Sequence, residues 1–363
     1  MKDPIIIIGA GVSGLHTASL LISKGIECRV LEARDRTGGR VLSTEVKDRP
    51  EIGRFDLGPT WFWPEHEPVI STIVRELGLE TIEQHTQGAV LLEQSKQGPA
   101  QRHLLPEGAI VRSVRLAGGI QSLTEAILAT LPEDLIQLDT RVKAVSMDDD
   151  GVLTVKAEHS NGEKEIIRAG AIIFALPPRI AAEQIDFAPV LPEELLASLK
   201  NKPTWMAGQA KVLAVYERPF WREEGLSGQV MSWTGPLQEI HDASPENGYG
   251  ALFGFFGMPA KERQALGEDK VRALAVSQLE RLFGPSAAEP ISLLYKDWSI
   301  DAETAVESDL QPLTSFPAYD EPVNTGIWGK KIIFAGTETS PEFGGHLEGA
   351  LRSAERAVDE ILR

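Results

Sequence analysis

Two glycine-rich segments at opposite ends of the chain constrain its fold more than any other feature. Residues 9–14 read GAGVSG and directly follow the apolar run Ile5–Ile8. Residues 335–350 read AGTETSPEFGGHLEGA and directly follow a second apolar run, Ile332–Phe334. Short apolar runs suit strands of a parallel sheet that are buried on both faces. We therefore expect the last segment to fold back onto the first, so that both contribute to one site for a long dinucleotide.

The N-terminal loop has the glycine spacing of a dinucleotide-phosphate site. Gly9 permits a tight turn, Gly11 lets the backbone approach a pyrophosphate, and Gly14 lets the next helix pack closely on the sheet. The phosphates would lie at the N-terminus of that helix, among free N–H groups. The second strand, residues 29–31, ends at Glu32, whose carboxylate can bind the ribose hydroxyls and would repel a 2′-phosphate. An ordinary βαβ turn without a nucleotide is the alternative.

The residues after Glu32 distinguish between dinucleotides. Residues 33–40 read ARDRTGGR, and with Glu32 they resemble the EARxRxGGR stretch of the flavin-containing amine oxidase superfamily. That superfamily includes monoamine oxidases, polyamine oxidases, L-amino-acid oxidases and related flavin desaturases. The resemblance implies FAD as the cofactor, and the guanidinium group of Arg40 could donate two parallel hydrogen bonds to a phosphate. Arg34 would either contact the adenosine or lie in solvent.

The resemblance extends nearly from end to end. Further similar segments are residues 55–61 (FDLGPTW), 116–123 (LAGGIQSL), 140–142 (TRV), 172–178 (IIFALPP), 211–222 (KVLAVYERPFWR) and 295–299 (YKDWS). Loop chemistry and resemblance together predict cofactor contacts at Gly9, Gly11, Ser13, Gly14, Glu32, Ala33, Arg34, Gly39, Arg40, Gly58, Pro59, Thr60, Trp61, Val142, Gly336, Glu338, Gly345, His346, Leu347 and Ala350. Free N–H groups of His346 and Leu347 are expected at the flavin ring, where a helix N-terminus would stabilise negative charge.

Three residues are predicted to be catalytic: Lys211, Trp298 and His346. By resemblance, Lys211 would hold a water at flavin N5 and help dioxygen reoxidise the ring; otherwise it is a solvated lysine at a strand start. Trp298 would contact the flavin or be a core aromatic. His346 stands where the family has a cage tyrosine, so it would form a wall of the site, titrate near neutral pH, bind a substrate carboxylate, or only fill the tyrosine's place. Tyr319 is a candidate for the facing cage position.

The fold class expected is α/β with α+β: a Rossmann-like FAD/NAD(P)-binding domain interleaved with a mixed-sheet substrate domain, as in the amine oxidase fold. The FAD-binding domain would take residues 1–78, 112–196 and 301–363, and the substrate domain residues 79–111 and 197–300. The interval 79–116 has room for one hairpin or a short helix, where the family usually inserts a longer helical region. A more open substrate site is therefore expected.

Composition excludes several other classes of function. Acidic residues outnumber basic ones by 53 to 36, and the net charge of −17 disfavours binding to nucleic acid or to an anionic membrane. Cys28 is the only cysteine, so no intrachain disulfide is possible, and no cysteine occurs in the 308–317 stretch that binds flavin covalently in some family members. We expect non-covalent FAD, no metal, and a cytoplasmic protein, because neither a signal peptide nor a membrane span is evident.

The function implied is FAD-dependent amine oxidation. A hydride would pass from the carbon that bears the amine to flavin N5, and dioxygen would be reduced to hydrogen peroxide. The imine would hydrolyse to an aldehyde or ketone. The alternatives are an L-amino-acid oxidase, which lacks support because no arginine follows the DLG stretch, a flavin desaturase, and a flavoprotein without turnover.

Overall fold

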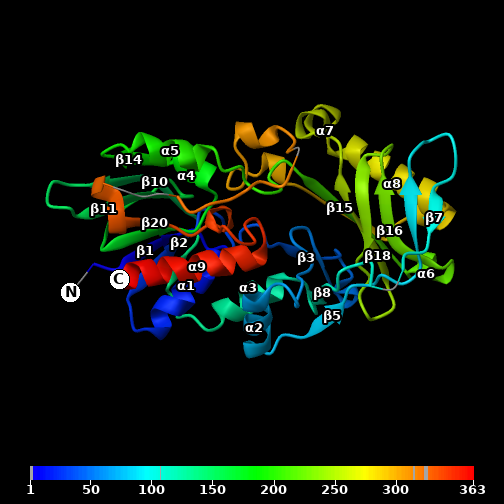
Figure 1. Cartoon of the computed structure of the whole chain (residues 1–363), viewed down its shortest axis with the longest axis horizontal. Coiled ribbons are helices and arrows are strands. Elements are labelled where there is room, and N and C mark those ends of the chain that lie inside the picture. The colour runs from blue at the N-terminus through cyan, green and yellow to red at the C-terminus, as the bar shows by residue number, and fades with distance from the viewer. Residues whose placement is uncertain (1–2, 107, 314, 323–325) are drawn as a thin grey trace.

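A computed structural model describes residues 3–106, 108–313, 315–322 and 326–363. The molecule has two lobes that lie side by side, and both termini lie in the same lobe (Figure 1). That lobe is built on a five-stranded sheet in the order β20-β13-β1-β2-β9, with every pair parallel. Its strands are β1 (Ile5–Ile8), β2 (Cys28–Leu31), β9 (Ile136–Gln137), β13 (Ala171–Phe174) and β20 (Ile332–Phe334).

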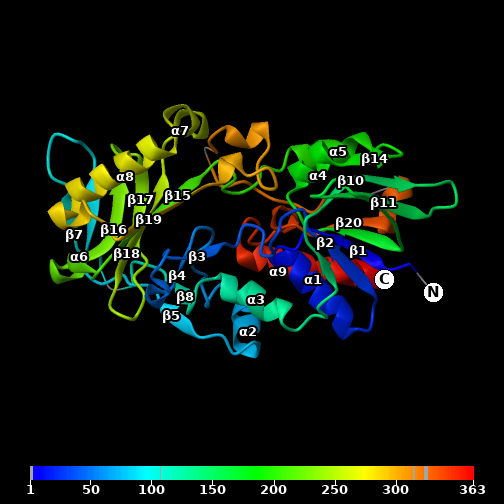
Figure 2. The same cartoon turned by 180° about the vertical axis from the view of Figure 1, so that it is seen from behind.

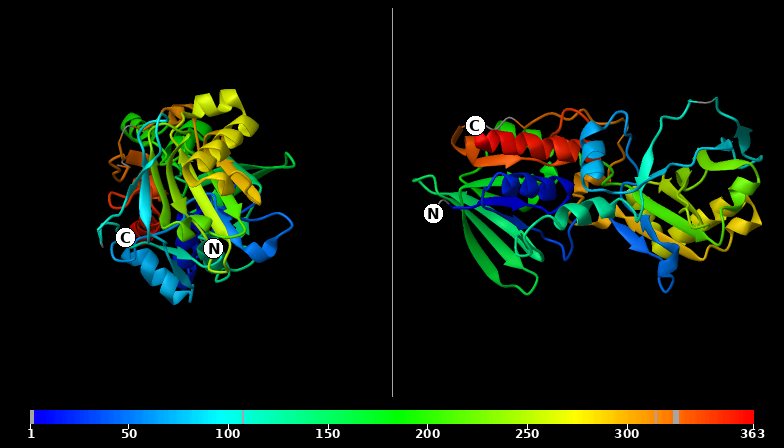
Figure 3. Two further views of the ribbon diagram at one scale, coloured as in Figure 1. Left: turned by 90° about the vertical axis from the view of Figure 1, so that its right-hand side faces the viewer. Right: turned by 90° about the horizontal axis from the view of Figure 1, so that it is seen from below.

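The two faces of this sheet are covered differently, which explains its continuous apolar runs. Ile5 and Ile7 of β1 face the helices α1 (Val12–Ser23), α3 (Gln121–Leu128) and α9 (Leu347–Leu362). Ile6 and Ile8 face a four-stranded sheet in the order β12-β11-β10-β14. Its strands are β10 (Thr140–Met147), β11 (Leu153–His159), β12 (Lys164–Ala169) and β14 (Asp186–Ala188), and α4 (Pro178–Gln184) and α5 (Glu193–Lys200) lie beside it. The predicted fold-back is confirmed, since β20 pairs with β13 and α9 packs on α1 (Figures 2 and 3).

The second lobe is a seven-stranded mixed sheet in the order β19-β15-β18-β17-β16-β6-β7. Its strands are β6 (Ala89–Glu93), β7 (Gln101–His103), β15 (Ala210–Tyr216), β16 (Leu226–Ser232), β17 (Leu237–Asp242), β18 (Gly250–Phe256) and β19 (Ser292–Asp297). One face packs on α8 (Glu268–Phe283), with α6 (Phe220–Glu223) and α7 (Ala260–Leu266) nearby. The other face, which includes Leu213, Val215 and Phe253, packs on residues from the first sixty of the chain. The expected fold class is therefore confirmed.

The remaining elements are short. They are the hairpin β3 (Ser43–Glu45) and β4 (Arg54–Asp56), the pair β5 (Thr81–Glu83) and β8 (Val114–Leu116), α2 (Pro68–Glu76), and 3₁₀ turns at Pro50–Ile52, Pro285–Ala287, Trp298–Ile300, Glu307–Leu310, Gly326–Lys331 and Thr337–Thr339. The described part of 79–116, which lacks only residue 107, holds strands and no helix. Its hairpin β6–β7 runs to the outer edge of the seven-stranded sheet (Figure 1). Within the described ranges, no helix is long and apolar enough to cross a membrane.

Candidate active site

One elongated pocket collects the segments singled out in the sequence. It runs past the carboxyl ends of β1, β2, β13 and β20 and reaches the face of the seven-stranded sheet that is turned toward the first lobe. All of the predicted site residues line it except Gly14 and Glu338. Binding at the carboxyl ends of parallel strands is the general rule for open α/β sheets.

The glycines of the first loop have different roles in the structure. A Cβ at Gly14 would lie 1.9 Å from the Gly9 carbonyl oxygen, so this glycine is required by the packing of α1 on the strand and not by contact with the pocket. Gly9 has φ of +106°, in the region that favours glycine. A Cβ at Gly11 would come no closer than 3.9 Å to the rest of the chain. The free side of Gly11 therefore belongs to whatever occupies the pocket.

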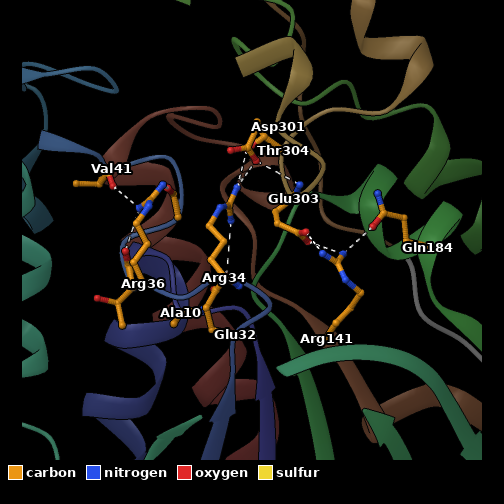
Figure 4. Close-up of polar contacts among 12 residues, drawn as sticks. Ala10, Glu32, Arg34, Arg36, Val41, Arg141, Gln184, Asp301, Glu303 and Thr304 are labelled. Carbon is orange, nitrogen blue, oxygen red and sulfur yellow. Dashed lines mark hydrogen bonds and ion pairs between the residues drawn. The ribbon is translucent and has the colours of Figure 1, made fainter. Parts of the chain in front are cut away.

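Glu32 lies at the end of β2 and is almost fully buried. One carboxylate oxygen accepts a hydrogen bond from the Ala10 N–H at 2.7 Å, and the other accepts one from the Arg34 N–H at 2.9 Å (Figure 4). A carboxylate oxygen has a second lone pair, so both oxygens can still accept hydrogen bonds from ribose hydroxyls. The backbone therefore aims this carboxylate into the pocket.

A turn at 301–304, far away in the sequence, closes over the same end of the pocket. Arg34 donates to Asp301 at 2.5 Å and to Thr304 at 3.0 Å, while Arg141 on β10 forms a two-pronged ion pair with Glu303 (Figure 4). The Arg34 side chain is 13% exposed, so it is a bridge between the two segments and not a solvated surface arginine. Neither partner acid was identified from the sequence.

Glu338 differs from its expected role. Its side chain is fully buried and accepts hydrogen bonds from both terminal nitrogens of Arg40, at 2.5 and 3.1 Å, and from the Trp205 N–H at 3.2 Å. It is absent from the pocket lining, where Gly336 and Thr337 stand instead. Glu338 therefore orients Arg40, which does reach the pocket.

Lys211 projects from β15 toward the first lobe and is 2% exposed. Its Nζ donates to the Gly58 carbonyl oxygen at 3.0 Å and to the Thr60 hydroxyl, and it lies 4.1 Å from the centre of the Phe253 ring. Burial lowers the pKa of Lys211 from 10.5 to about 7, although the neighbouring Asp56 opposes the shift. A solvated lysine, the alternative considered from the sequence, is excluded.

Trp298 supports the same stretch of chain from another side. It begins the 3₁₀ turn after β19, is nearly buried, and donates its Nε1–H to the Leu57 carbonyl oxygen at 3.0 Å. Lys211 and Trp298 therefore hold residues 57–60 in place between them, and all six of these residues line the pocket.

His346 precedes α9 and forms one wall of the pocket. Its Nδ1 lies 3.1 Å from a carboxylate oxygen of Glu67, a residue that the sequence did not single out. The Trp63 and Phe316 rings lie 5.5 and 5.8 Å from the imidazole. Tyr319 does not take the facing cage position, because it lies outside the pocket lining and donates its hydroxyl to the Pro203 carbonyl oxygen.

The backbone N–H groups at the start of α9 are only partly free. The His346 N–H donates to the Phe343 carbonyl oxygen at 3.0 Å, so the expectation that it faces the flavin is wrong. The Leu347 N–H has no partner among the residues that the structure describes. Of these two N–H groups, therefore, only that of Leu347 is free to bind a group in the pocket.

The pocket fits FAD. At one end, the buried carboxylate of Glu32 can accept hydrogen bonds from a ribose, and Gly11 leaves the backbone accessible to phosphates. At the other end, aromatic rings line the pocket around Lys211. Cys28 lies in β2 and is buried outside the pocket lining, so no thiol is available for covalent attachment of the flavin.

Comparisons with known proteins agree with this site. The family described as flavin containing amine oxidoreductase matches residues 12–110 and 89–362. Putrescine oxidase of Kocuria rosea is 26% identical over 481 residues, covering 100% of this chain and 95% of the relative. Solved structures of putrescine oxidase bound to putrescine and of cyclohexylamine oxidase from Brevibacterium oxydans IH-35A each have a TM-score of 0.78 at 21% identity. They cover 100% and 99% of this chain, respectively, and 99% of each neighbour.

The Kocuria enzyme is longer than this chain. The alignment with the Kocuria enzyme spans 481 residues, whereas this chain has 363, so the relative contains substantial segments that this chain lacks. The two matched ranges of the family overlap at residues 89–110, the region of β6 and β7.

Proposed function

Because the chain belongs to the flavin containing amine oxidoreductases and is an FAD-dependent amine oxidase, we propose that Lys211, Trp298 and His346 form its catalytic site. The proposal rests chiefly on the position of Lys211, which is buried in the pocket and hydrogen-bonded to the wall at 58–60. When bound, FAD supplies the acceptor for the hydride of the amine and passes the electrons to dioxygen. The overall products are an aldehyde or ketone, ammonia or an amine, and hydrogen peroxide.

The chain's own residues bind and orient. Glu32 would bind the ribose of FAD, the loops at 9–14 and 38–40 would bind its pyrophosphate, and Val142 would contact its adenine. Lys211 has three N–H donors when charged, and two of them are used by Gly58 and Thr60. The third holds a water in the pocket and supplies positive charge where dioxygen is reduced. Trp298 keeps the wall at 57–60 in place.

The substrate class follows from the charges around the pocket. The three arginines that line it are all paired, Arg34 with Asp301, Arg40 with Glu338 and Arg141 with Glu303. No unpaired arginine is therefore left among the described lining residues to clamp a substrate carboxylate. This favours amines that carry no carboxylate beside the reacting carbon over L-amino acids.

We also propose the division into two domains expected from the sequence. Every strand of the five-stranded sheet falls within 1–78, 112–196 or 301–363, and every strand of the seven-stranded sheet falls within 79–111 or 197–300. A cytoplasmic location stays a prediction, which fractionation of the source cells would test.

The function is tested by adding pooled amines, polyamines or L-amino acids to the yellow holoenzyme without dioxygen and following the flavin absorbance. Bleaching by an amine pool, reversed by air with release of peroxide, is the expected result. Bleaching by L-amino acids alone would contradict the proposed substrate class, and no bleaching by any pool would favour a desaturase or a binding role.

The proposed role of Lys211 is tested separately with Lys211→Met. Amines should still bleach the flavin of this variant, but its return in air should be slower by roughly a hundredfold, the usual loss for one preorganised electrostatic group. Reoxidation at the wild-type rate would refute this role.

A further inference from the structure

Two helices that begin next to each other hold Glu67 and His346 together. The Glu67 residue precedes α2, and His346 precedes α9. The carboxylate of Glu348, in the first turn of α9, accepts hydrogen bonds from the Val69 and Ile70 N–H groups at 3.2 and 2.9 Å, which caps the N-terminus of α2. This cap holds the starts of the two helices together, which brings the Glu67 carboxylate next to the His346 imidazole.

The surroundings of Glu67 use its carboxylate as a hydrogen-bond acceptor. It is 1% exposed, and its second oxygen accepts a hydrogen bond from the Trp63 N–H at 2.8 Å. Because an ionised carboxylate can only accept, the bond to His346 requires the proton to be on Nδ1. In the neutral imidazole Nε2 then carries a lone pair. Nε2 makes no hydrogen bond within the described residues, and the side chain is 29% exposed where it lines the pocket.

Oxidation of an amine requires a base that removes a proton from its ammonium form. An alkylamine has a pKa close to that of lysine, so at pH 7 only roughly one molecule in a few thousand is uncharged. The ammonium form has no nitrogen lone pair to form the C=N bond as the hydride leaves, and it must first lose a proton.

We propose that Glu67 orients His346 so that Nε2 accepts one proton from the substrate's ammonium group before the amine is oxidised. This inference rests on the proposed function and names the base in that same site. The ammonium loses one N–H bond and becomes the neutral amine, while His346 gains one N–H bond and becomes imidazolium. Electrons of the C–H bond are not involved, and the net charge of the site plus substrate is unchanged. Glu67 stays ionised and pairs with the new cation.

Glu67 also determines which ligands the histidine can bind. An imidazolium paired with Glu67 carries no net positive charge, so it has little attraction for a substrate carboxylate. A neutral imidazole with Glu67 carries a net negative charge, which attracts a cationic amine. His346 is therefore the base for amines and not a carboxylate clamp, one of the roles considered from the sequence.

The other charged groups around His346 are paired or lie across the pocket. On α9 and in the segment before it, Glu348 and Glu342 both pair with Arg352. Glu338 pairs with Arg40. From the part of the 311–319 segment that the structure describes, the Phe316 ring contacts the imidazole, and from β15 Lys211 lines the same pocket. Of these groups, Glu67 alone is hydrogen-bonded to the imidazole.

The test uses tert-butylamine, which has no hydrogen on its α-carbon and so cannot be oxidised. Its binding to the holoenzyme is followed by the change in the flavin spectrum between pH 5.5 and 8.5. In the wild type the Kd should be constant at high pH and rise tenfold per pH unit below a bend, because a protonated His346 cannot accept the proton. In His346→Gln and His346→Tyr the bend should disappear. In Glu67→Gln it should move to lower pH, because the imidazolium loses its partner charge.

The matched control is Glu342→Gln, which removes an exposed carboxylate from the same segment and should leave the bend in place. A bend that persists in His346→Gln would belong to another group, such as Lys211, and would overturn the proposal. So would a Glu67→Gln profile that matches the wild type, or an absence of binding throughout the range. Because tert-butylamine is not turned over, none of these outcomes depends on whether any amine bleaches the flavin.

Discussion

Replacing the buried lysine of the pocket should make the protein more stable at neutral pH. Burial lowers the pKa of Lys211 from 10.5 to about 7, so the folded state resists a charge that the unfolded chain carries freely. At pH 7 this difference costs the folded state about 4 kcal/mol, at 1.36 kcal/mol per pKa unit. Lys211→Met removes the cost but leaves Gly58 and Thr60 without their donor, a loss of about 1 kcal/mol each. The net expectation is a gain of about 2 kcal/mol.

The sign of this difference should reverse with pH. Between pH 7 and 10.5 the unfolded wild-type chain binds more protons than the folded protein, so wild-type stability rises with pH relative to the variant. At pH 9.5 the cost has fallen to about 1.5 kcal/mol, and the variant should then be slightly less stable than the wild type.

The assay is the free energy of unfolding in urea, measured for both proteins with the same excess of FAD at pH 7 and pH 9.5. Lys156→Met, on an exposed position of β11, is the control and should show no such dependence. A Lys211→Met protein that is less stable than the wild type at pH 7, by an amount that does not change up to pH 9.5, would refute the reasoning.

Two further predictions concern the cofactor. Gly14→Ala places a Cβ 1.9 Å from the Gly9 carbonyl oxygen and should yield protein with little or no flavin, whereas Gly11→Ala meets nothing closer than 3.9 Å and should fold but bind FAD more weakly. The flavin-to-protein absorbance ratio and an FAD titration check both, and a fully loaded Gly14→Ala protein would contradict the first. Glu303→Gln weakens the ion pair with Arg141 and should speed FAD release by roughly fivefold, for a loss of about 1 kcal/mol. Flavin fluorescence after dilution measures that rate, and an unchanged rate would show that the 301–304 turn does not retain the cofactor.

Local patterns in the sequence were enough to predict the framework of the fold. The apolar runs before Gly9 and Ala335 form β1 and β20, and Lys211 lies near the start of β15, as the sequence predicted. These elements could be predicted because the apolar residues that each one buries are adjacent or regularly spaced in its own sequence.

The contacts that were missed join residues far apart in the chain. Glu67 binds His346 across 279 positions, and Arg34 binds Asp301 across 267. Nothing in the residues around Glu67 distinguishes it from an ordinary acid before a helix that begins with proline. The path of residues 79–116 could not be predicted either. A short hairpin can pair with any of several sheet edges, and which edge it joins depends on the rest of the fold.

The order of strands β20-β13-β1 has a consequence for biosynthesis. The phosphate loop is synthesised long before β20 and α9. Until they emerge, β13 presents an unpaired edge and α1 an uncovered apolar face, which are features that chaperones recognise and that promote aggregation. FAD therefore cannot be fully enclosed until β20 and α9 have been synthesised and have packed on the first strands.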